Sequence, residues 1–207
     1  MSDRQIDAYP DFASSHRSKP ASRVFVLGAS TGGIECLCEV LRGLDTPNAI
    51  VAVVHRGRGD GRRVHTLLSY FATQKIVHAF NEQAVLPGRI YLASPSEVMR
   101  LHATHIETAP VTDERANRLD PLFASAAAGF GPRVVAVLLS GVGEDGMRGL
   151  SAVRAARGVV IVQSPADAAE PDAPSRAIRL GYADRTVKLA EIGPLLQSLA
   201  SGSSVAR

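Results

Sequence analysis

The chain has 207 residues, a formal net charge of +3 and a hydrophobic fraction of 45%. This length predicts one domain, and the scarcity of aromatic residues indicates a core built from Val, Leu, Ile and Ala. No apolar run approaches the ~20 residues that a membrane span requires. Residues 1–10 contain no apolar stretch of the kind found in secretory signals. We therefore expect a cytoplasmic protein that does not insert into membranes.

The positive charge is concentrated between His55 and His65. The arginines of this segment are opposed by Asp60 alone, and their excess equals the net charge of the whole chain. They are Arg56, Arg58, Arg62 and Arg63. The segment is either a solvated loop or a docking surface for an acidic protein partner, so these arginines are candidates for substrate docking. Because no interleaved aromatic residues or nucleic-acid-binding motif accompany them, we expect no nucleic-acid partner.

The folded part of the chain is expected between residues 23 and 199. Residues 1–22 are polar and aperiodic, as in a disordered leader or the remnant of a linker, and 200–207 predict a loose tail. Between them, strand and helix patterns alternate, which predicts a doubly wound, mostly parallel α/β sheet with helices on both faces. Short alternating runs within 84–108 predict an antiparallel hairpin or meander at one edge. The expected strands are 23–28, 49–54, 75–79, 89–93, 133–139 and 159–162, and the expected helices are 32–42, 61–72, 120–129, 145–156, 174–180 and 188–199.

Ser30 lies in the pattern that most strongly indicates catalysis. An apolar run leads directly into Gly28-Ala-Ser-Thr-Gly-Gly33, and apolar residues at helical spacing follow. Strand, Gly-x-Ser-x-Gly and helix is the layout of a nucleophile elbow, in which glycines permit a sharp turn that lifts a serine hydroxyl onto the rim of a sheet. A serine of this kind requires a base and an orienting acid.

His55 is the candidate base. It directly follows the apolar run 49–54 and therefore lies at the carboxyl end of a predicted strand, where reactive groups gather in open parallel sheets. The other five histidines fall in the leader, in a helix, in a short strand or in the edge segment, where we expect surface or structural roles.

Asp145 is the candidate acid. The apolar run 133–139 is followed by Ser140-Gly-Val-Gly-Glu-Asp-Gly-Met147 and then by a predicted helix. Asp145 therefore lies near a helix start, which favours an ionised carboxylate, and it is placed to hold the second ring nitrogen of His55. Glu144 is the competing carboxylate, and helix capping is an alternative role for Asp145.

Two further patterns resemble cofactor-binding or metal-binding motifs. Gly141-Val-Gly-Glu-Asp-Gly146 matches G-x-G-x-x-G, but its two carboxylates would repel a pyrophosphate at the helix start. The glycines are better explained by a close approach of this loop to Ser30. Cys36 and Cys38 lie two apart on a predicted helix and point away from each other, so we expect free thiols rather than a disulfide or a metal site.

Three segments occur in a characteristic order: Gly28-Ala-Ser-Thr-Gly-Gly33, a strand ending in His55, and Gly141-Val-Gly-Glu-Asp-Gly146. Together they resemble the catalytic domain of the chemotaxis protein-glutamate methylesterase (CheB) family. The resemblance covers about residues 23–199 and includes Gly88-Arg-Ile-Tyr-Leu-Ala93, Leu119-Asp-Pro-Leu-Phe123 and Ala173-Pro-Ser-Arg-Ala-Ile178. The chain order Ser, His, Asp also differs from the order Ser, Asp, His of α/β-hydrolases.

The resemblance implies a doubly wound α/β fold with an antiparallel edge hairpin. It implies hydrolysis of glutamyl γ-methyl esters on the helical cytoplasmic domains of chemoreceptors, and many family members also deamidate glutamines there. By position, Ser30 is the nucleophile, His55 the general base and Asp145 the orienting acid, and no metal or organic cofactor is implied. The backbone amides of Thr31 and Val142 are candidates to bind the oxyanion.

Three features depart from the family pattern. Family members commonly carry an N-terminal receiver domain, whereas only a short leader precedes Arg23, so a separate receiver protein is a candidate partner. The arginine-rich segment replaces the small or apolar residues and the Pro that usually follow the catalytic His. The loop 163–172 is shorter and richer in proline than usual. Two alternatives therefore stay open: a related stand-alone esterase or amidase with another protein substrate, and a non-catalytic docking module within a signalling complex.

Overall fold

The computed structural model describes residues 23–47, 50–55, 61–113 and 116–202, and for 50–55 it describes the backbone alone. The expected leader 1–22, the segment that holds Arg56 and Arg58, and the last part of the expected tail lie outside the described residues. None of the described helices is long and apolar enough to cross a membrane.

Every expected helix and strand is present, with ends that differ by at most a few residues. The elements are β1 (Val24–Ala29), α1 (Gly33–Leu41), β2 (Ile50–His55), α2 (Gly61–Phe71), β3 (Ile76–His78), β4 (Gln83–Ala84), β5 (Arg89–Leu92), β6 (Glu97–Leu101), β7 (His105–Pro110), α3 (Leu119–Phe130), a 3-10 turn (Gly131–Arg133), β8 (Val134–Leu138), α4 (Met147–Ala155), β9 (Val159–Gln163), α5 (Asp172–Arg179), β10 (Arg185–Val187) and α6 (Leu189–Ala200).

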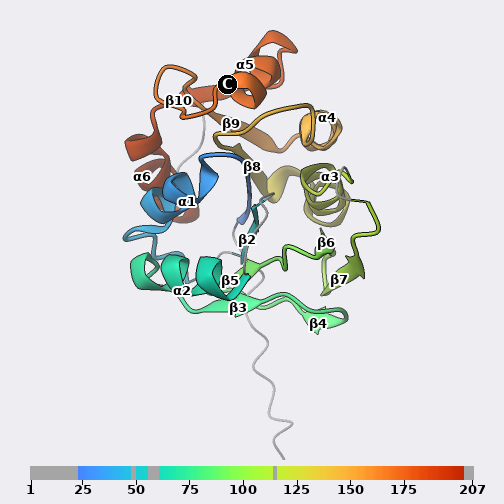
Figure 1. Cartoon of the computed structure of the whole chain (residues 1–207). Helices are drawn as coiled ribbons and strands as arrows, with labels where there is room; N and C mark the ends of the chain where they lie inside the picture. The colour runs from blue at the N-terminus through green and yellow to red at the C-terminus, as the bar shows by residue number, and fades with distance from the viewer. Residues whose placement is uncertain (1–22, 48–49, 56–60, 114–115, 203–207) are drawn as a thin grey trace, which may run out of the picture.

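The main sheet has seven parallel strands in the order β10-β9-β8-β1-β2-β5-β3, and it crosses Figure 1 from top to bottom. β1 lies near the middle, with β2 on one side and β8 on the other. The strand order therefore reverses at β1, and such a switch point is where open α/β sheets bind ligands beyond the carboxyl ends of their strands. The expected doubly wound α/β class is confirmed.

Helices cover both faces of this sheet, because its inner strands are apolar on both sides. Along β1, Val24 and Val26 contact the layer formed by α3, α4 and α5, whereas Phe25 and Leu27 contact the layer formed by α1, α2 and α6. All four side chains are fully buried. Figure 1 shows α1, α2 and α6 on one side of the sheet and α3 on the other. Burial on both faces explains the nearly continuous apolar runs that mark these strands in the sequence.

The antiparallel part of the fold is present, but it is not an edge of the main sheet. β4, β7 and β6 form a separate three-stranded sheet, in which β6 and β7 are the expected antiparallel hairpin. Met99, Leu101 and Ile106 attach this small sheet to the core beside α3. β5 instead pairs with β2 and β3 in the parallel sheet, because Ile90 and Tyr91 are fully buried there.

A glycine sets the distance between α3 and α4. A Cβ added at Gly149 would lie 2.6 Å from the Cβ of Phe123 and 3.0 Å from the carbonyl oxygen of Asp120. We expect Gly149→Ala to lower the free energy of unfolding by roughly 1–3 kcal/mol, because this overlap outweighs the gain in helix propensity of about 1 kcal/mol. Urea unfolding measures the effect, and the exposed Ser151→Ala on the same helix is the control. A stability equal to or above that of the wild type would contradict this packing.

Candidate active site

Ser30 directly follows β1 at the carboxyl end of the sheet. Its N–H donates a hydrogen bond of 3.0 Å to the carbonyl oxygen of Ser140, and its own carbonyl accepts one of 2.9 Å from Gly33 at the start of α1. Gly32, between them, has a φ of 70°, a left-handed conformation that favours glycine. The strand, the sharp turn and the helix of the predicted nucleophile elbow are therefore present, with Ser30 8% exposed.

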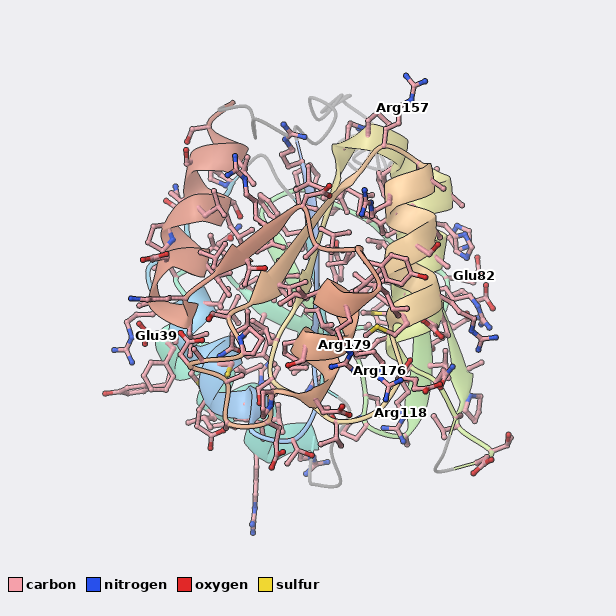
Figure 2. The ribbon with its side chains drawn as sticks, turned by 90° about the horizontal axis from the view of Figure 1, so that it is seen from above. Glu39, Glu82, Arg118, Arg157, Arg176 and Arg179 are labelled. Carbon is pink, nitrogen blue, oxygen red and sulfur yellow. The ribbon has the colours of Figure 1, made fainter. Side chains whose placement is uncertain are left out.

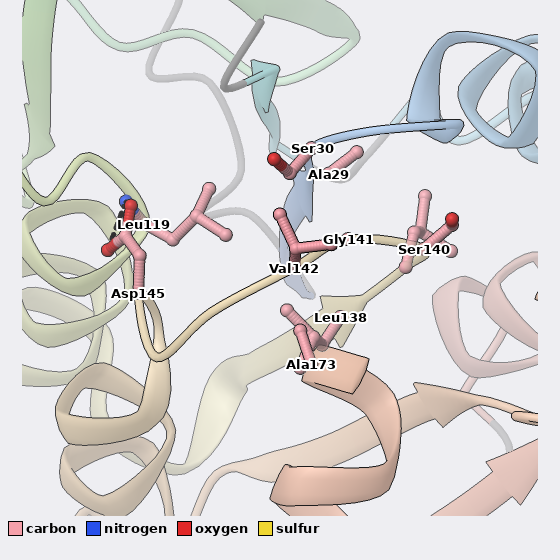
Figure 3. A pocket seen from close by; sticks show the side chains of 10 residues that line it. Ala29, Ser30, Leu119, Leu138, Ser140, Gly141, Val142, Asp145 and Ala173 are labelled. Carbon is pink, nitrogen blue, oxygen red and sulfur yellow. Dashed lines mark hydrogen bonds between the residues drawn. The ribbon is translucent and has the colours of Figure 1, made fainter. Parts of the chain in front are cut away.

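The glycine loop that follows β8 touches Ser30, as the sequence predicts. A Cβ added at Gly141 would lie 2.9 Å from the Cβ of Ser30, closer than such atoms approach in proteins, so only glycine fits here. Figure 3 shows a small pocket between this loop and the end of β1. Its lining includes Ser30, Leu119, Ser140, Gly141, Val142 and Asp145.

His55 ends β2, next to the nucleophile turn. Its backbone pairs with that of Ala29, the residue that precedes Ser30. The two strands run parallel, so the carboxyl end of β2 lies at the same rim as Ser30. This backbone position is the one that the sequence predicts for the base; the side chain of His55 lies outside what the structure describes, so its role stays a prediction.

Asp145 is buried and holds the start of α3, although in the chain it lies just before α4. Its carboxylate accepts hydrogen bonds of 2.8 to 3.1 Å from the N–H groups of Arg118, Leu119 and Asp120. These donors and the positive end of α3 complement the charge of the carboxylate. The carboxylate is thereby fixed on the side of the pocket opposite the Ser30 hydroxyl (Figure 3).

Glu144 occupies a different environment from its neighbour Asp145. Its carboxylate is 2.8 Å from the guanidinium of Arg176 on α5, and its side chain is 77% exposed. In the view of Figure 2, Arg118 and Arg176 lie in the lower half of the molecule, whereas Arg157, which follows α4, lies at the upper end. Of the two competing carboxylates, only Asp145 lines the pocket that contains Ser30.

The two candidate oxyanion donors are available. Within the described residues, the N–H groups of Thr31 and Val142 have no hydrogen-bond acceptor. Thr31 follows Ser30 just before α1, and Val142 lies in the glycine loop with its side chain 45% exposed. An N–H without an acceptor can donate a hydrogen bond to a developing oxyanion with little rearrangement.

The remaining candidates divide between described and undescribed parts of the chain. Arg62 and Arg63 lie in the first turn of α2 and are exposed, whereas Arg56 and Arg58 lie outside the described residues.

Cys36 and Cys38 are free and buried, as expected, and burial raises the pKa of both thiols. Among the described residues, no group of three or more His, Cys, Asp or Glu side chains is arranged to hold a metal ion.

Sequence reasoning missed the polar residues that hold the glycine loop. Ser140 and Gln163 are both fully buried, and the side-chain oxygen of Gln163 accepts a 2.8 Å hydrogen bond from the N–H of Ser140. Asp172, at the start of α5, accepts one of 2.8 Å from the N–H of Gly143. The sequence does mark Ser140 and Gln163, because each is a polar residue that directly follows a run of apolar strand residues.

The family described as CheB methylesterase matches residues 25–196. An uncharacterised 104.1 kDa protein of Rhodobacter capsulatus is 40% identical over 131 residues, 62% of this chain and 14% of that protein. A protein-glutamate methylesterase/protein-glutamine glutaminase of Moorella thermoacetica is 31% identical over 194 residues, 89% of this chain and 46% of that protein. The chain thus spans less than half the length of both relatives.

The fold has a counterpart among solved structures. The catalytic domain of the CheB methylesterase of Thermotoga maritima superposes with a TM-score of 0.75 at 23% sequence identity, covering 86% of this chain and 98% of that one. The family match spans most of the chain and the whole of the pocket described above. The chain therefore belongs to the CheB methylesterase family.

Proposed function

We propose that the protein is a serine hydrolase that demethylates glutamyl γ-methyl esters on the cytoplasmic helices of chemoreceptors. Membership of the family supports the reaction class, and relatives are named protein-glutamate methylesterase/protein-glutamine glutaminase. The observation that carries the proposal is the placement of Ser30 at the switch point of the sheet, in contact with the glycine loop and across a pocket from a fixed carboxylate. Hydrolysis of glutamine amides at the same site, which releases ammonia instead of methanol, belongs to the proposal.

The chemistry proceeds in two halves. His55 takes the hydroxyl proton while Ser30 Oγ attacks the ester carbonyl carbon, and the N–H groups of Thr31 and Val142 bind the resulting oxyanion. When the tetrahedral intermediate collapses, the C–O bond to the methoxy group breaks, and His55 gives its proton to departing methanol. Water then attacks the carbonyl carbon of the acyl-enzyme, and His55 takes a proton from it. When this second intermediate collapses, the bond to Ser30 Oγ breaks, His55 returns the proton to Ser30 Oγ, and a glutamate is left. Asp145 orients His55 and stabilises its protonated form.

The partners follow from this substrate. Methylated receptor helices are cytoplasmic, so the proposed site of action is the cytoplasm. Arg62 and Arg63 lie in the first turn of α2, which follows β2 and its rim residue His55, and they are suited to acidic residues of a receptor helix. A separate receiver protein is proposed as a regulatory partner.

The nucleophile is tested by Ser30→Ala. We expect turnover to fall by about 10⁴-fold or more, because attack by water would have to replace the covalent route. The assay measures release of labelled methanol from methylated receptor cytoplasmic domains, with ammonia release measured in parallel. Thermal unfolding of the variant should match that of the wild type. Retained release by a folded Ser30→Ala protein would exclude the mechanism.

The acid is tested by a matched pair of amide substitutions. Asp145→Asn turns an N–H₂ group toward the N–H donors of α3, so we expect the free energy of unfolding to fall by about 1–3 kcal/mol. Turnover at a temperature where the protein is folded should fall by about 10³- to 10⁴-fold. Glu144→Gln breaks only the exposed pair with Arg176 and should change stability by less than about 1 kcal/mol and turnover by less than about 3-fold. Loss of turnover in Glu144→Gln alone would reverse the assignment of the acid.

A further inference from the structure

The peptide group that carries the Thr31 N–H is fixed by its neighbours. The N–H of Ser30 donates to the Ser140 carbonyl at 3.0 Å, and the carbonyl of Ser30 accepts from Gly33 at 2.9 Å. The carbonyl of Thr31 accepts a 2.9 Å hydrogen bond from the hydroxyl of Ser140. Three successive peptide groups are therefore held, and the Thr31 N–H belongs to the middle one.

The peptide group that carries the Val142 N–H is held in the same way. The N–H of Gly141 donates to the Glu170 carbonyl at 3.0 Å, and the carbonyl of Gly141 accepts from Ala173 at 3.0 Å. The N–H of Gly143 donates to the carboxylate of Asp172 at 2.8 Å. The middle one of these three peptide groups again carries the N–H that has no acceptor among the described residues.

Ser140 connects the two segments. Its hydroxyl donates to Thr31 in the nucleophile turn and accepts a 2.9 Å hydrogen bond from the N–H of Glu170, which holds the glycine loop. Gln163 holds the backbone of Ser140. Its side-chain oxygen accepts hydrogen bonds from the Ser140 N–H at 2.8 Å and from the Cys36 thiol at 3.4 Å. Ser140 and Gln163 are fully buried, so water does not compete for these bonds.

We propose that Ser140 and Asp172 are positioning residues, which hold the Thr31 and Val142 N–H groups at the separation that one oxyanion requires. This inference rests on the proposed function. Neither side chain binds substrate; each acts through the backbone of a neighbouring segment. Their effect is greatest in the transition state, where the negative charge develops, so their loss lowers kcat and leaves KM nearly unchanged.

Ser140→Ala isolates the hydroxyl, because the backbone hydrogen bond from Ser30 to Ser140 remains. We expect kcat for methanol release to fall about 10- to 100-fold with KM within about 2-fold of the wild type. The pH at half-maximal kcat should not move, since the base is untouched. Ser125→Ala is the matched control: that hydroxyl also accepts from one backbone N–H, of Leu101, and donates to one carbonyl, of Leu122, but in α3 away from the pocket. A folded Ser140→Ala protein with the kcat of Ser125→Ala would overturn the role of Ser140.

Asp172→Ala tests the second positioning residue. If Ser140→Ala does not fold, this variant alone decides whether the inference holds. Asp172 is exposed, so its removal leaves the core intact. We expect kcat to fall about 10-fold without a change in KM. Asp184→Ala is the matched control, because the Asp184 carboxylate likewise accepts a single backbone hydrogen bond of 2.8 Å, from Val160 in β9. Equal kcat values for the two variants would overturn the role of Asp172.

A fluorophosphonate probe separates failure of this inference from failure of the proposed function. Ser30 Oγ forms a bond to phosphorus, the P–F bond breaks, fluoride leaves, and the serine proton passes to His55. The phosphonyl oxygen takes the place of the oxyanion, so the rate of labelling depends on the same N–H groups. If the wild type is labelled but hydrolyses no receptor ester, the proposed substrate is wrong. The labelling rates of the variants then decide the inference: slower labelling of Ser140→Ala and Asp172→Ala than of their controls supports it, and equal rates overturn it. If Ser30 is not labelled, both proposals are overturned.

Discussion

The backbone hydrogen bond from Ser30 to Ser140 is the constraint from which the rest of the site follows. It joins the end of β1 to the end of β8, two neighbouring strands that the chain reaches more than a hundred residues apart. The bond can form only because Gly141 has no side chain at the point where the glycine loop meets Ser30. Once this contact is made, the nucleophile turn and the glycine loop lie against each other, and Ser30 and Val142 line the same small pocket.

The position of the Asp145 carboxylate depends on reciprocal hydrogen bonds between the starts of α3 and α4. Asp145, just before α4, accepts the first N–H groups of α3, while Asp120 in α3 accepts a 2.8 Å hydrogen bond from Gly149 in α4. Each carboxylate thus satisfies N–H groups that have no partner within their own helix. Asp145 serves as a helix cap and also lines the pocket, so the structural and the catalytic interpretations of this residue are compatible. Its position is set by a helix that has to be in place for the core to form.

The sequence predicts those parts of the molecule that depend on local patterns. Periodicity located the helices and most strands, and the rule on strand ends placed Ser30 and Asp145 at one rim. Contacts between distant segments were not predictable, such as the cap that Asp145 forms on α3 or the separate sheet of β4, β7 and β6. β10 was missed because it has three residues, of which Arg185 and Thr186 are exposed and give no apolar signal. Ser140 was given no role, because its role depends on partners from three other segments.

The most direct test is a crystal structure of the protein after reaction with a fluorophosphonate. The proposed mechanism predicts a covalent bond from phosphorus to Ser30 Oγ, with the phosphonyl oxygen about 2.7–3.1 Å from the backbone nitrogens of both Thr31 and Val142. It also predicts the His55 ring between Ser30 and the carboxylate of Asp145. A phosphonyl oxygen that faces away from both nitrogens, or a probe bound to another residue, would contradict it.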